Sequence, residues 1–429
     1  NLSLTKSHNV QPERPSVVVI GMRAAGKTTL SKWCATALGY KFLDLDHEFE
    51  RVNCKEGETI KEYVAAHGWD NFRAEEASLF KRIIAQIGHQ GYVISSGGGL
   101  VENSDSRVAL KKFAFQDNGI VLHLHRDIDE TVTFLNKDPT RPAYVEDIKT
   151  VAKRRERWYQ ECCNFIFYSP HCETPVEFQS LRKSFETFAQ RMVGQVEDKI
   201  PTKRSAFVCL TYDDIEQQDP ATLRAITYGC SAVELRVDHL KNFSPEYVNR
   251  QLSILRMATD SFPIVFTIRT KKQGGLFPDE DYKGIYALYK MAMKAAVEYI
   301  DLELTLPNDI QNSVLNERSH CTKIISSHHD FPAEFPWTHS EWEERYNQAM
   351  SINADIVKFV GTATKFEDNL LLEEFRAKHT SKPLIAINMT ARGKISRVLN
   401  TVLTPVTSEL LPAASAPGQL TVKQINQLY

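Results

Sequence analysis

Short apolar runs alternate with amphipathic, helix-like stretches along most of the chain. The first 14 residues are polar, and we expect a tether there. The alternation begins at residue 15, lapses into polar residues near Gly194, and begins again at Ser205. This pattern predicts two domains, at residues 15–195 and 205–429, joined by a linker at 196–204.

The second half repeats one unit, an apolar strand-like run followed by a helical stretch. Helical stretches such as 280–297 and 340–351 separate most of the runs. Seven runs and a weaker eighth predict parallel βαβ units that close into a (β/α)₈ TIM barrel. An open doubly wound sheet is the alternative, but its usual glycine-rich first turn is absent. The runs lie at 206–211, 232–237, 264–270, 299–304, 323–327, 355–360, 384–389 and 401–406.

The first half opens with an apolar run at 17–20, a glycine-containing loop and a helical stretch at 29–38. The loop fits the pattern GxxxxGK[ST] in the strand–loop–helix context that lets backbone N–H groups surround phosphates. We expect Lys27 to reach the β- and γ-phosphates of ATP and Thr28 to bind Mg²⁺. A chance glycine turn is the alternative. The predicted nucleotide-binding residues are Gly21, Met22, Arg23, Ala24, Ala25, Gly26, Lys27, Thr28 and Thr29.

Two carboxylates follow the next apolar run, at 40–43. Asp44 and Asp46 stand at a strand end, where both can face the nucleotide. One can support Mg²⁺ and the other can orient a hydroxyl acceptor.

Further along, glycines and arginines indicate a site for a small anionic acceptor. Gly97-Gly98-Gly99 follows a strand-like run at 92–95 and lets the backbone approach a ligand closely. Arg73 and Arg155 suit a carboxylate on that ligand. Taken singly, an arginine is more often a solvated surface residue.

With these residues in place, the first half resembles shikimate kinase, a parallel-sheet P-loop fold. The resemblance implies ATP as donor and shikimate as acceptor, with Asp46 at shikimate. From the residues themselves we expect Asp46 and Lys27 to be catalytic and Asp44 to join Thr28 at Mg²⁺. The resemblance also implies a mobile lid at 136–147 from which Arg141 stabilises the transferring phosphoryl group. A P-loop kinase for another small alcohol is the alternative. The marks are the loop at 21–28, Asp44-x-Asp46, Phe72-Arg73, Gly97-Gly98-Gly99, Arg141-Pro142 and residues 155–159, and the implied shikimate contacts are Asp46, Arg73, Gly97, Gly98, Gly99 and Arg155.

A lysine lies inside an apolar strand of the second half. Lys358 interrupts the run at 355–360. Near the carboxyl end of a barrel strand it would be in the catalytic zone. Desolvation lowers the pKa of a lysine, and a neutral amine can form a Schiff base. A lysine that reaches solvent from the outer face of the strand is the alternative.

Other predicted strands carry charged residues in the same way. Glu234 and Arg236 are two positions apart, as are Asp301 and Glu303, and Arg269 ends a third run. Side chains two apart on a strand share a face. We therefore expect a polar site where the strands end, with a core of buried ion pairs as the alternative.

These residues make the second half resemble type I 3-dehydroquinate dehydratase, an enzyme that needs no cofactor. The resemblance implies that Lys358 forms an imine with the C3 ketone of 3-dehydroquinate. His329 would remove a proton from C2 and then aid loss of the C1 hydroxyl as water. The marks are residues 234–238, 266–270, 327–331, Lys358, Ser396-Arg397 and 415–419, and the implied substrate contacts are Glu234, Arg236, Arg269, Met389, Arg397, Ser415 and Gln419.

Two features near the predicted base qualify this interpretation. His328 and His329 are adjacent, so both cannot face the site from a regular strand, and the motif selects His329. Gln273 departs from a glutamate that bacterial members often have, which leaves proton transfer and loop closure open.

Composition narrows the class of protein. The 429 residues carry 52 basic and 54 acidic side chains, which gives a net charge of −2 with histidine neutral. This near balance provides no overall electrostatic attraction to nucleic acid or anionic membranes. No apolar run approaches the ~20 residues of a membrane span. The eight cysteines are scattered without metal-like spacing, which predicts free thiols in the cytoplasm.

The order of the two halves resembles the central part of fungal pentafunctional AROM proteins. The two reactions are not consecutive, because a reductase step lies between them, and no GxGxxG segment supplies it here. The chain has no initiator methionine, so we expect further AROM domains in cis and a homodimer for the full-length protein. A silent quinate-repressor-like sensor is the alternative, although Lys27, Asp46, Arg155, His329 and Lys358 are all present.

Overall fold

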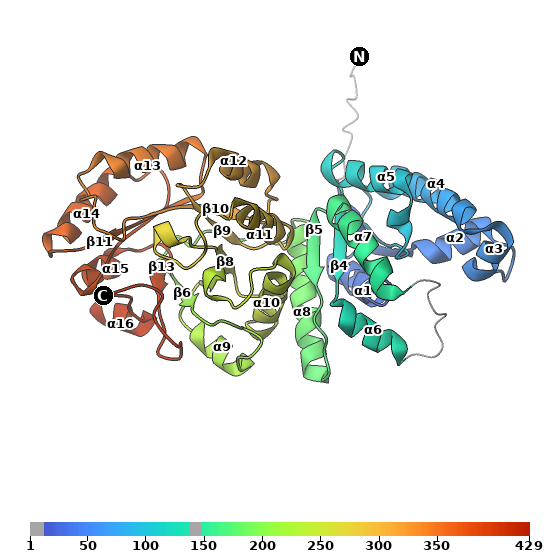
Figure 1. Cartoon of the computed structure of the whole chain (residues 1–429), viewed down its shortest axis with the longest axis horizontal. Helices are drawn as coiled ribbons and strands as arrows, with labels where there is room; N and C mark the ends of the chain where they lie inside the picture. The colour runs from blue at the N-terminus through green and yellow to red at the C-terminus, as the bar shows by residue number, and fades with distance from the viewer. Residues whose placement is uncertain (1–12, 138–146) are drawn as a thin grey trace, which may run out of the picture. The chain divides into compact units, whose positions relative to one another are not determined.

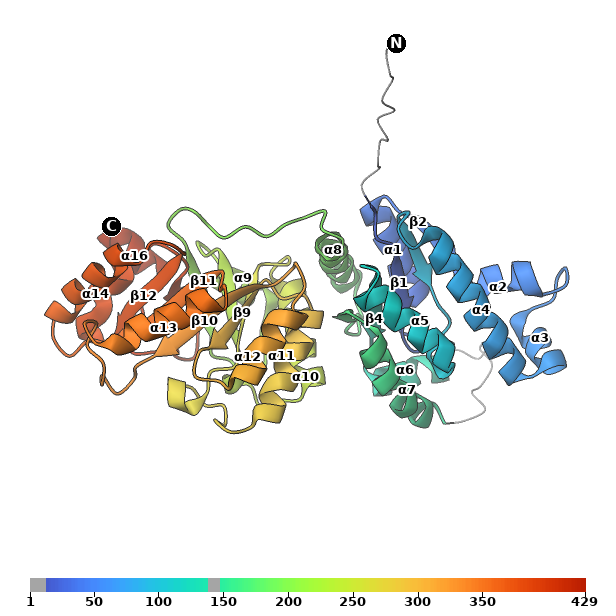
Figure 2. The same ribbon diagram turned by 90° about the horizontal axis from the view of Figure 1, so that it is seen from above.

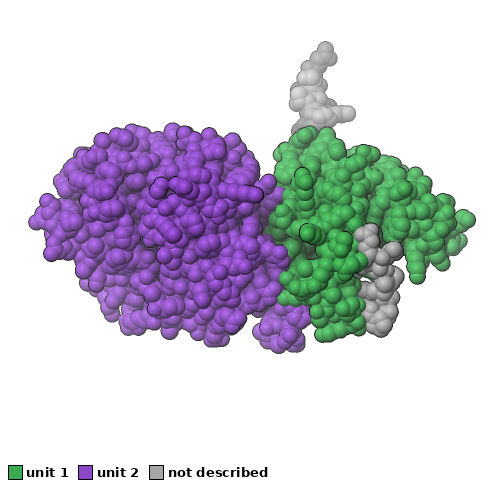
Figure 3. Space-filling model, viewed as in Figure 1, with its two compact units in different colours: residues 1–167 green, residues 168–429 purple. Residues whose placement is uncertain are grey.

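The computed structural model describes residues 13–137 and 147–429. Contacts divide the chain into two compact units, residues 1–167 and 168–429, which Figure 3 colours green and purple. Arg141, most of the predicted lid and most of the predicted tether lie outside the described residues. Within the described residues, no helix is long and apolar enough to cross a membrane.

The first unit is built on a five-stranded sheet with the order β2-β3-β1-β4-β5 (Figure 1). The ladders of β1 with β3 and β4, and of β2 with β3, are parallel. All four side chains of β1 are buried, as its valine and isoleucine composition requires. Because β2, β3 and β1 are neighbours, the loops after them meet at one edge of the sheet. The strands are β1 (Val17–Ile20), β2 (Lys41–Asp44), β3 (Tyr92–Ser95), β4 (Ile120–His125) and β5 (Phe165–Tyr168).

Helices flank this sheet and form the hydrophobic core with it. The first helix begins at the end of the predicted phosphate loop. The helices are α1 (Lys27–Leu38), α2 (Leu45–Asn53), α3 (Ile60–His67), α4 (Trp69–Ile87), α5 (Ser104–Phe115), α6 (Ile128–Asn136) and α7 (Ile148–Cys162).

The second unit is a nearly closed barrel of eight strands in the order β12-β11-β10-β9-β8-β7-β6-β13. The ladders between neighbouring strands of the barrel are parallel, and a shared register places Glu303, Ser327 and Lys358 side by side across three strands. The predicted barrel is confirmed, and the open-sheet alternative is wrong. The strands are β6 (Ala206–Leu210), β7 (Ala232–Arg236), β8 (Ile264–Thr267), β9 (Tyr299–Glu303), β10 (Lys323–His329), β11 (Ile356–Thr362), β12 (Leu384–Met389) and β13 (Thr404–Val406).

Helices surround the barrel strands, as Figures 1 and 2 show from two directions. Their apolar faces and the outward side chains of the strands form the largest core cluster. The helix α8, which precedes the barrel in sequence, packs on α10 of the same unit. The helices are α8 (Pro175–Met192), α9 (Pro220–Ile226), α10 (Pro245–Ala258), α11 (Tyr282–Lys294), α12 (Asn308–Glu317), α13 (Ser340–Ser351), α14 (Glu367–Lys378), α15 (Lys394–Leu399) and α16 (Val422–Leu428).

Candidate active sites

The phosphate loop of the first unit joins β1 to α1. Gly21 and Gly26 have φ angles of 150° and 88°. A β-carbon at Gly21 would lie 2.5 Å from the carbonyl oxygen of Leu124, so no other residue fits there. The ammonium of Lys27 donates to the carbonyls of Gly21 and Met22, both at 2.8 Å. The loop therefore has the compact form that presents backbone N–H groups to phosphates.

Burial sets the charge state of the loop lysine. Desolvation lowers the pKa of Lys27 to about 8, and Asp46 and Asp44 act in the opposite direction. Thr28 and Thr29 are exposed in the first turn of α1. Lys27, Thr28 and Thr29 thus form the first turn of α1, at the helix N-terminus, where backbone N–H groups favour phosphates.

The two predicted carboxylates have different surroundings. Asp44 Oδ1 accepts hydrogen bonds from the backbone of Asp46 at 2.9 Å and His47 at 3.2 Å, which caps α2. The side chain of Asp46 is exposed, but desolvation by its surroundings, together with the negative charge of Asp44, raises its pKa. Asp46 is therefore the better placed of the two to bind a hydroxyl group.

Three of the side chains that were predicted to bind the acceptor lie against the glycine segment after β3. A β-carbon at Gly97 would lie 2.8 Å from Asp46 Oδ1, and one at Gly99 would lie 1.9 Å from Arg73 Nη2. A β-carbon at Gly98 would lie 3.5 Å from Arg155 Nη1 and 3.2 Å from the backbone nitrogen of Arg23. The structure thus brings the predicted acceptor residues together beside the phosphate loop.

Sequence reasoning missed two acids that hold the arginines. Arg73 Nη1 lies 2.8 Å from Glu76 Oε2, and Arg155 Nε lies 2.8 Å from Glu102 Oε1. Glu76 is buried, and desolvation raises its pKa to about 7. The pairing of Glu76 with Arg73 could have been predicted, because residues three apart on a helix are neighbours. Glu102 is distant in sequence from Arg155, and only the fold pairs them.

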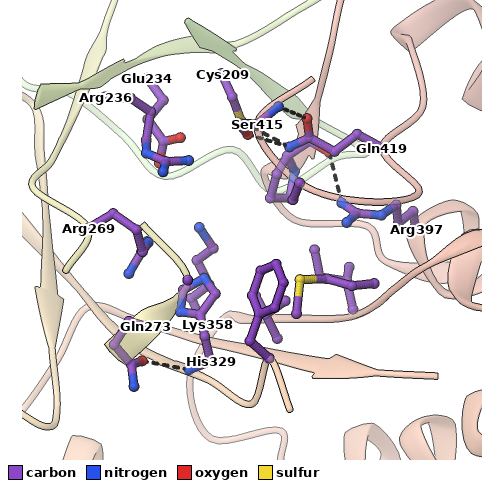
Figure 4. Close-up of a pocket in the computed structure, with 17 residues that line it drawn as sticks. Cys209, Glu234, Arg236, Arg269, Gln273, His329, Lys358, Arg397, Ser415 and Gln419 are labelled. Atoms are coloured by element: carbon purple, nitrogen blue, oxygen red, sulfur yellow. Dashed lines mark hydrogen bonds between the residues drawn. The ribbon is translucent and has the colours of Figure 1, made fainter. Parts of the chain in front are cut away.

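In the second unit, the carboxyl ends of the barrel strands surround a cavity (Figure 4). Every residue that was predicted for dehydroquinate chemistry lines it. These residues are Glu234, Arg236, Arg269, His329, Lys358, Met389, Arg397, Ser415 and Gln419.

Lys358 projects into this cavity from β11. The side chain is 6% exposed, and its Nζ lies 3.8 Å from Asp301 Oδ2. Burial lowers the pKa of Lys358, while Glu234 and Asp301 oppose the shift. The lysine does not reach solvent from the outer face of the barrel, and its amine is suited to nucleophilic attack.

The two adjacent histidines point in opposite directions, as strand alternation requires. His329 lines the cavity, and burial, with Arg269 next in effect, holds its pKa well below the usual value. His328 packs against Trp342 on α13, with ring centroids 5.5 Å apart. At neutral pH, His329 is therefore an uncharged imidazole that can accept a proton.

Gln273 supports the segment that carries this base. Its side chain is buried, and its Oε1 accepts a hydrogen bond from the backbone N–H of His329 at 2.8 Å. An amide oxygen makes this contact as a carboxylate oxygen would. The residue that departs from the bacterial pattern therefore still fixes the position of His329.

The three arginines of the cavity differ in their partners. Arg269 binds Asp301 at 2.8 Å and Glu303 at 3.1 Å, and Arg236 binds both carboxylate oxygens of Asp238 at 2.8 Å. Asp301 and Glu303 do not line the cavity, so this pair forms a buried ion-pair support for Arg269.

Arg397, by contrast, has no carboxylate within ion-pair distance among the described residues. Its guanidinium donates to the carbonyls of Pro405 at 3.5 Å and Pro417 at 3.3 Å. Its Nε is buried with no hydrogen-bond partner. Desolvation lowers the pKa of Arg397 to about 10. A buried guanidinium of this kind favours an anionic ligand.

Hydrogen bonds between Gln419 and Ser415 hold the last loop of the barrel together. Gln419 Oε1 accepts from the backbone of Ser415 at 2.9 Å, and its Nε2 donates to Ser415 Oγ at 2.8 Å. The same Nε2 lies 3.5 Å from Cys209 Sγ. Cys209 was not predicted at this site, since inside an apolar strand it is indistinguishable from a core residue.

Comparison with known proteins agrees with both geometries. The family model of type I 3-dehydroquinase matches residues 206–429, and that of shikimate kinase matches residues 23–193. The pentafunctional AROM polypeptide of Kluyveromyces lactis is 60% identical over 100% of this chain and 27% of its own length. That of Lachancea thermotolerans is 61% identical over 96% of this chain and 26% of its own length. The chain thus spans about a quarter of these relatives.

A solved structure supports the assignment of the second half. It is the dehydroquinate dehydratase and shikimate dehydrogenase part of AroM from S. pombe, at 42% identity and a TM-score of 0.51. The match covers 53% of this chain and 44% of that one. Both resemblances that the motifs indicated are confirmed. The chain belongs to the type I 3-dehydroquinase family, and a shikimate kinase domain precedes its barrel.

Proposed function

We propose that this chain catalyses two reactions of the shikimate pathway. One is ATP-dependent phosphorylation of shikimate to shikimate 3-phosphate. The other is dehydration of 3-dehydroquinate to 3-dehydroshikimate. The observation that carries the proposal is the placement of a buried, low-pKa Lys358 in the same cavity as the uncharged His329.

In the barrel, the amine of Lys358 attacks the C3 ketone and loses water to give a protonated imine. The imine acidifies the protons at C2, and His329 removes one of them. The resulting electron pair expels the C1 hydroxyl, which leaves as water with the proton from His329. Hydrolysis of the imine then releases 3-dehydroshikimate and regenerates Lys358.

The substrate carboxylate pairs with Arg397, because Arg236 and Arg269 are already held by acids of the chain. Glu234 accepts a hydrogen bond from Thr267 at 2.8 Å and offsets the positive charge around Lys358. Ser415 and Gln419 bind ring hydroxyls from the last loop, and Met389 supplies an apolar wall.

In the kinase domain, Asp46 orients the attacking hydroxyl of shikimate and Lys27 binds the transferring phosphoryl group. Arg73 and Arg155 bind the shikimate carboxylate, and Gly97-Gly98-Gly99 let the ring approach the backbone closely. The remaining loop residues surround the nucleotide phosphates. Arg141, which lies outside the described residues, adds a positive charge over the phosphoryl group.

The hydroxyl of Thr28 and a carboxylate oxygen of Asp44 would hold Mg²⁺, and oxygen donors of this kind fit that ion. Asp44 uses Oδ1 to cap α2, which fixes the direction of the carboxylate. When bound, the ion neutralises charge on the β- and γ-phosphates.

The proposal is tested by measuring both turnovers on one preparation. Dehydratase activity is followed by the ultraviolet absorbance of the conjugated product, and kinase activity by shikimate-dependent release of ADP. Borohydride added with 3-dehydroquinate should attach substrate mass to Lys358 alone. Binding without turnover at both sites would contradict the proposal and favour the sensor alternative, which the relatives do not support.

We also propose the wider setting of the chain. The functional domains extend over residues 15–195 and 205–429, with a linker at 196–204. The chain acts in the cytoplasm within a longer polypeptide that carries the other AROM domains and forms a homodimer. Size-exclusion chromatography with light scattering on the full-length protein tests the dimer.

A further inference from the structure

Two histidines and a glutamate lie close together beside the phosphate loop and have no role in either proposed reaction. His123 and His125 are on β4, and Glu156 is on α7. One ligand atom from each can be chosen so that all three lie within 4.8 Å of one another. In the described part of the chain, this is the one such group.

The strand itself aligns the two imidazoles. Residues i and i+2 of a strand point to the same face, so His123 and His125 face together while Leu124 faces away. Their ring centroids are 5.5 Å apart, with planes at 88°. The ring of Tyr159 stacks on His123 at 4.9 Å, which fixes the orientation of the buried imidazole.

The carboxylate comes from the helix that covers this end of the strand. Glu156 Oε2 lies 3.7 Å from His125 Nδ1, and Glu156 Oε1 accepts a hydrogen bond from Gln160 at 2.7 Å. The neighbouring Arg154 and Arg155 each bind Glu102 at 2.8 Å. A hydrogen-bonded carboxylate beside two aligned imidazoles is an arrangement that serves metal ligation well.

We propose that His123, His125 and Glu156 bind a divalent ion of the zinc class, such as Zn²⁺ or Co²⁺. Two imidazoles and one carboxylate are a ligand set that zinc uses when one position stays open. Imidazole nitrogen disfavours Mg²⁺, which prefers oxygen, so this site is chemically distinct from that of the phosphotransfer ion.

The geometry allows the ligands to close on an ion. With bonds of about 2.1 Å, tetrahedral ligand atoms lie about 3.4 Å apart, so atoms that are now up to 4.8 Å apart must approach by at most about 1.4 Å. Glu156 is half-buried on a helix surface and has rotatable bonds to supply this movement. His123 also adjoins Gly21, where a β-carbon would lie 3.7 Å from His123 Cδ2, so the ion would bind next to the phosphate loop.

The test is a titration of the nucleotide-free chain with Co²⁺ in an excess of Mg²⁺, followed by visible absorption. The excess Mg²⁺ occupies oxygen sites and leaves the imidazole site to Co²⁺. We expect one equivalent to bind with the intense bands of a four- or five-coordinate ion, and Zn²⁺ to displace it. H125A and E156Q should each weaken binding by at least about 10-fold.

His171→Ala is the matched control, because His171 is an exposed imidazole 3.9 Å from the carboxylate of Glu173. It should bind Co²⁺ like the unaltered chain. Far-ultraviolet circular dichroism and kinase turnover in Mg²⁺ alone verify that H125A and E156Q are folded. Absence of the bands in the unaltered chain, or equal binding by folded H125A, overturns the proposal. Retained binding by E156Q alone would overturn the three-ligand set.

Discussion

The two candidate active sites of this chain differ in how much of each is backbone and how much is side chain. The kinase site is made largely of backbone, with a phosphate loop of eight consecutive residues and three glycines that fit against Asp46, Arg73 and Arg155. The dehydratase site is made of side chains that come from strands and loops between Cys209 and Gln419. A site made of backbone leaves a contiguous motif, whereas a barrel site leaves single residues far apart.

Charge is also managed differently at the two sites. In the kinase domain, desolvation raises the pKa values of both Asp46 and Glu76, while Arg73 pairs with Glu76 and Arg155 pairs with Glu102. In the barrel, Arg269 has two acids and Arg236 has one, while Arg397 has none within the described residues. In the barrel, Arg269 and Arg236 are thus neutralised by acids of the chain, and the positive charge of Arg397 is left for an anionic ligand.

Lys358→Ala separates the two sites most completely. Removal of the nucleophile should lower dehydratase kcat/KM by at least about 10⁴-fold, because no second lysine lines the cavity among the described residues. Kinase turnover of the same preparation should stay unchanged and is the internal control. Dehydratase activity that survives this change would remove the proposed imine from the mechanism.

Arg397→Ala tests whether the unpaired guanidinium holds the substrate. Loss of a buried, charge-assisted contact should lower dehydratase kcat/KM by about 10- to 10²-fold, mainly through KM. Arg397→Lys keeps the charge and should recover part of the loss. An unchanged KM for 3-dehydroquinate in folded Arg397→Ala would assign the carboxylate to another residue.

Gly99→Ala tests whether the kinase site needs a glycine at this position, where the backbone lies against Arg73. The new methyl group would lie 1.9 Å from the guanidinium of Arg73, so that side chain must leave its place. We expect kinase kcat/KM for shikimate to fall by about 10-fold, the value of one charged hydrogen bond, with KM for ATP little changed. A matched fall in ATP affinity would indicate a disordered loop and not a displaced arginine.

Gln273→Glu should have the smallest effect, below about 10-fold at neutral pH. A carboxylate near His329 favours the imidazolium and raises the pKa of His329. A protonated base cannot accept the C2 proton, so the acid limb of the pH profile of kcat/KM should move to higher pH. Gln273→Met, which removes the acceptor for the His329 N–H, should instead lower the rate without moving the limb.

The sequence predicted the fold well, because both architectures depend on local periodicity. All eight barrel strands lie where apolar runs were expected, and the weak run at 401–406 contains β13. It also predicted that Lys358 and His329 would face one cavity, from strand alternation and the family motif. It did not predict that Asp301 and Glu303 support Arg269 from outside the cavity. The alternation of side chains along a strand shows which face a residue is on, but not how far it lies from the cavity.

The sequence by itself determined the classes of chemistry in this protein. A phosphate loop and a lysine within an apolar strand are local patterns, and each carries its physical meaning in a few consecutive residues. Only the tertiary structure decided which acid neutralises which arginine, because Glu102 and Arg155, or Arg269 and Asp301, meet through the packing of distant elements. For the same reason, only the fold brought Glu156 beside the two histidines of β4. Pairing of charges depends on distance in space, and that distance is set by the sheet order and the helices that cover it.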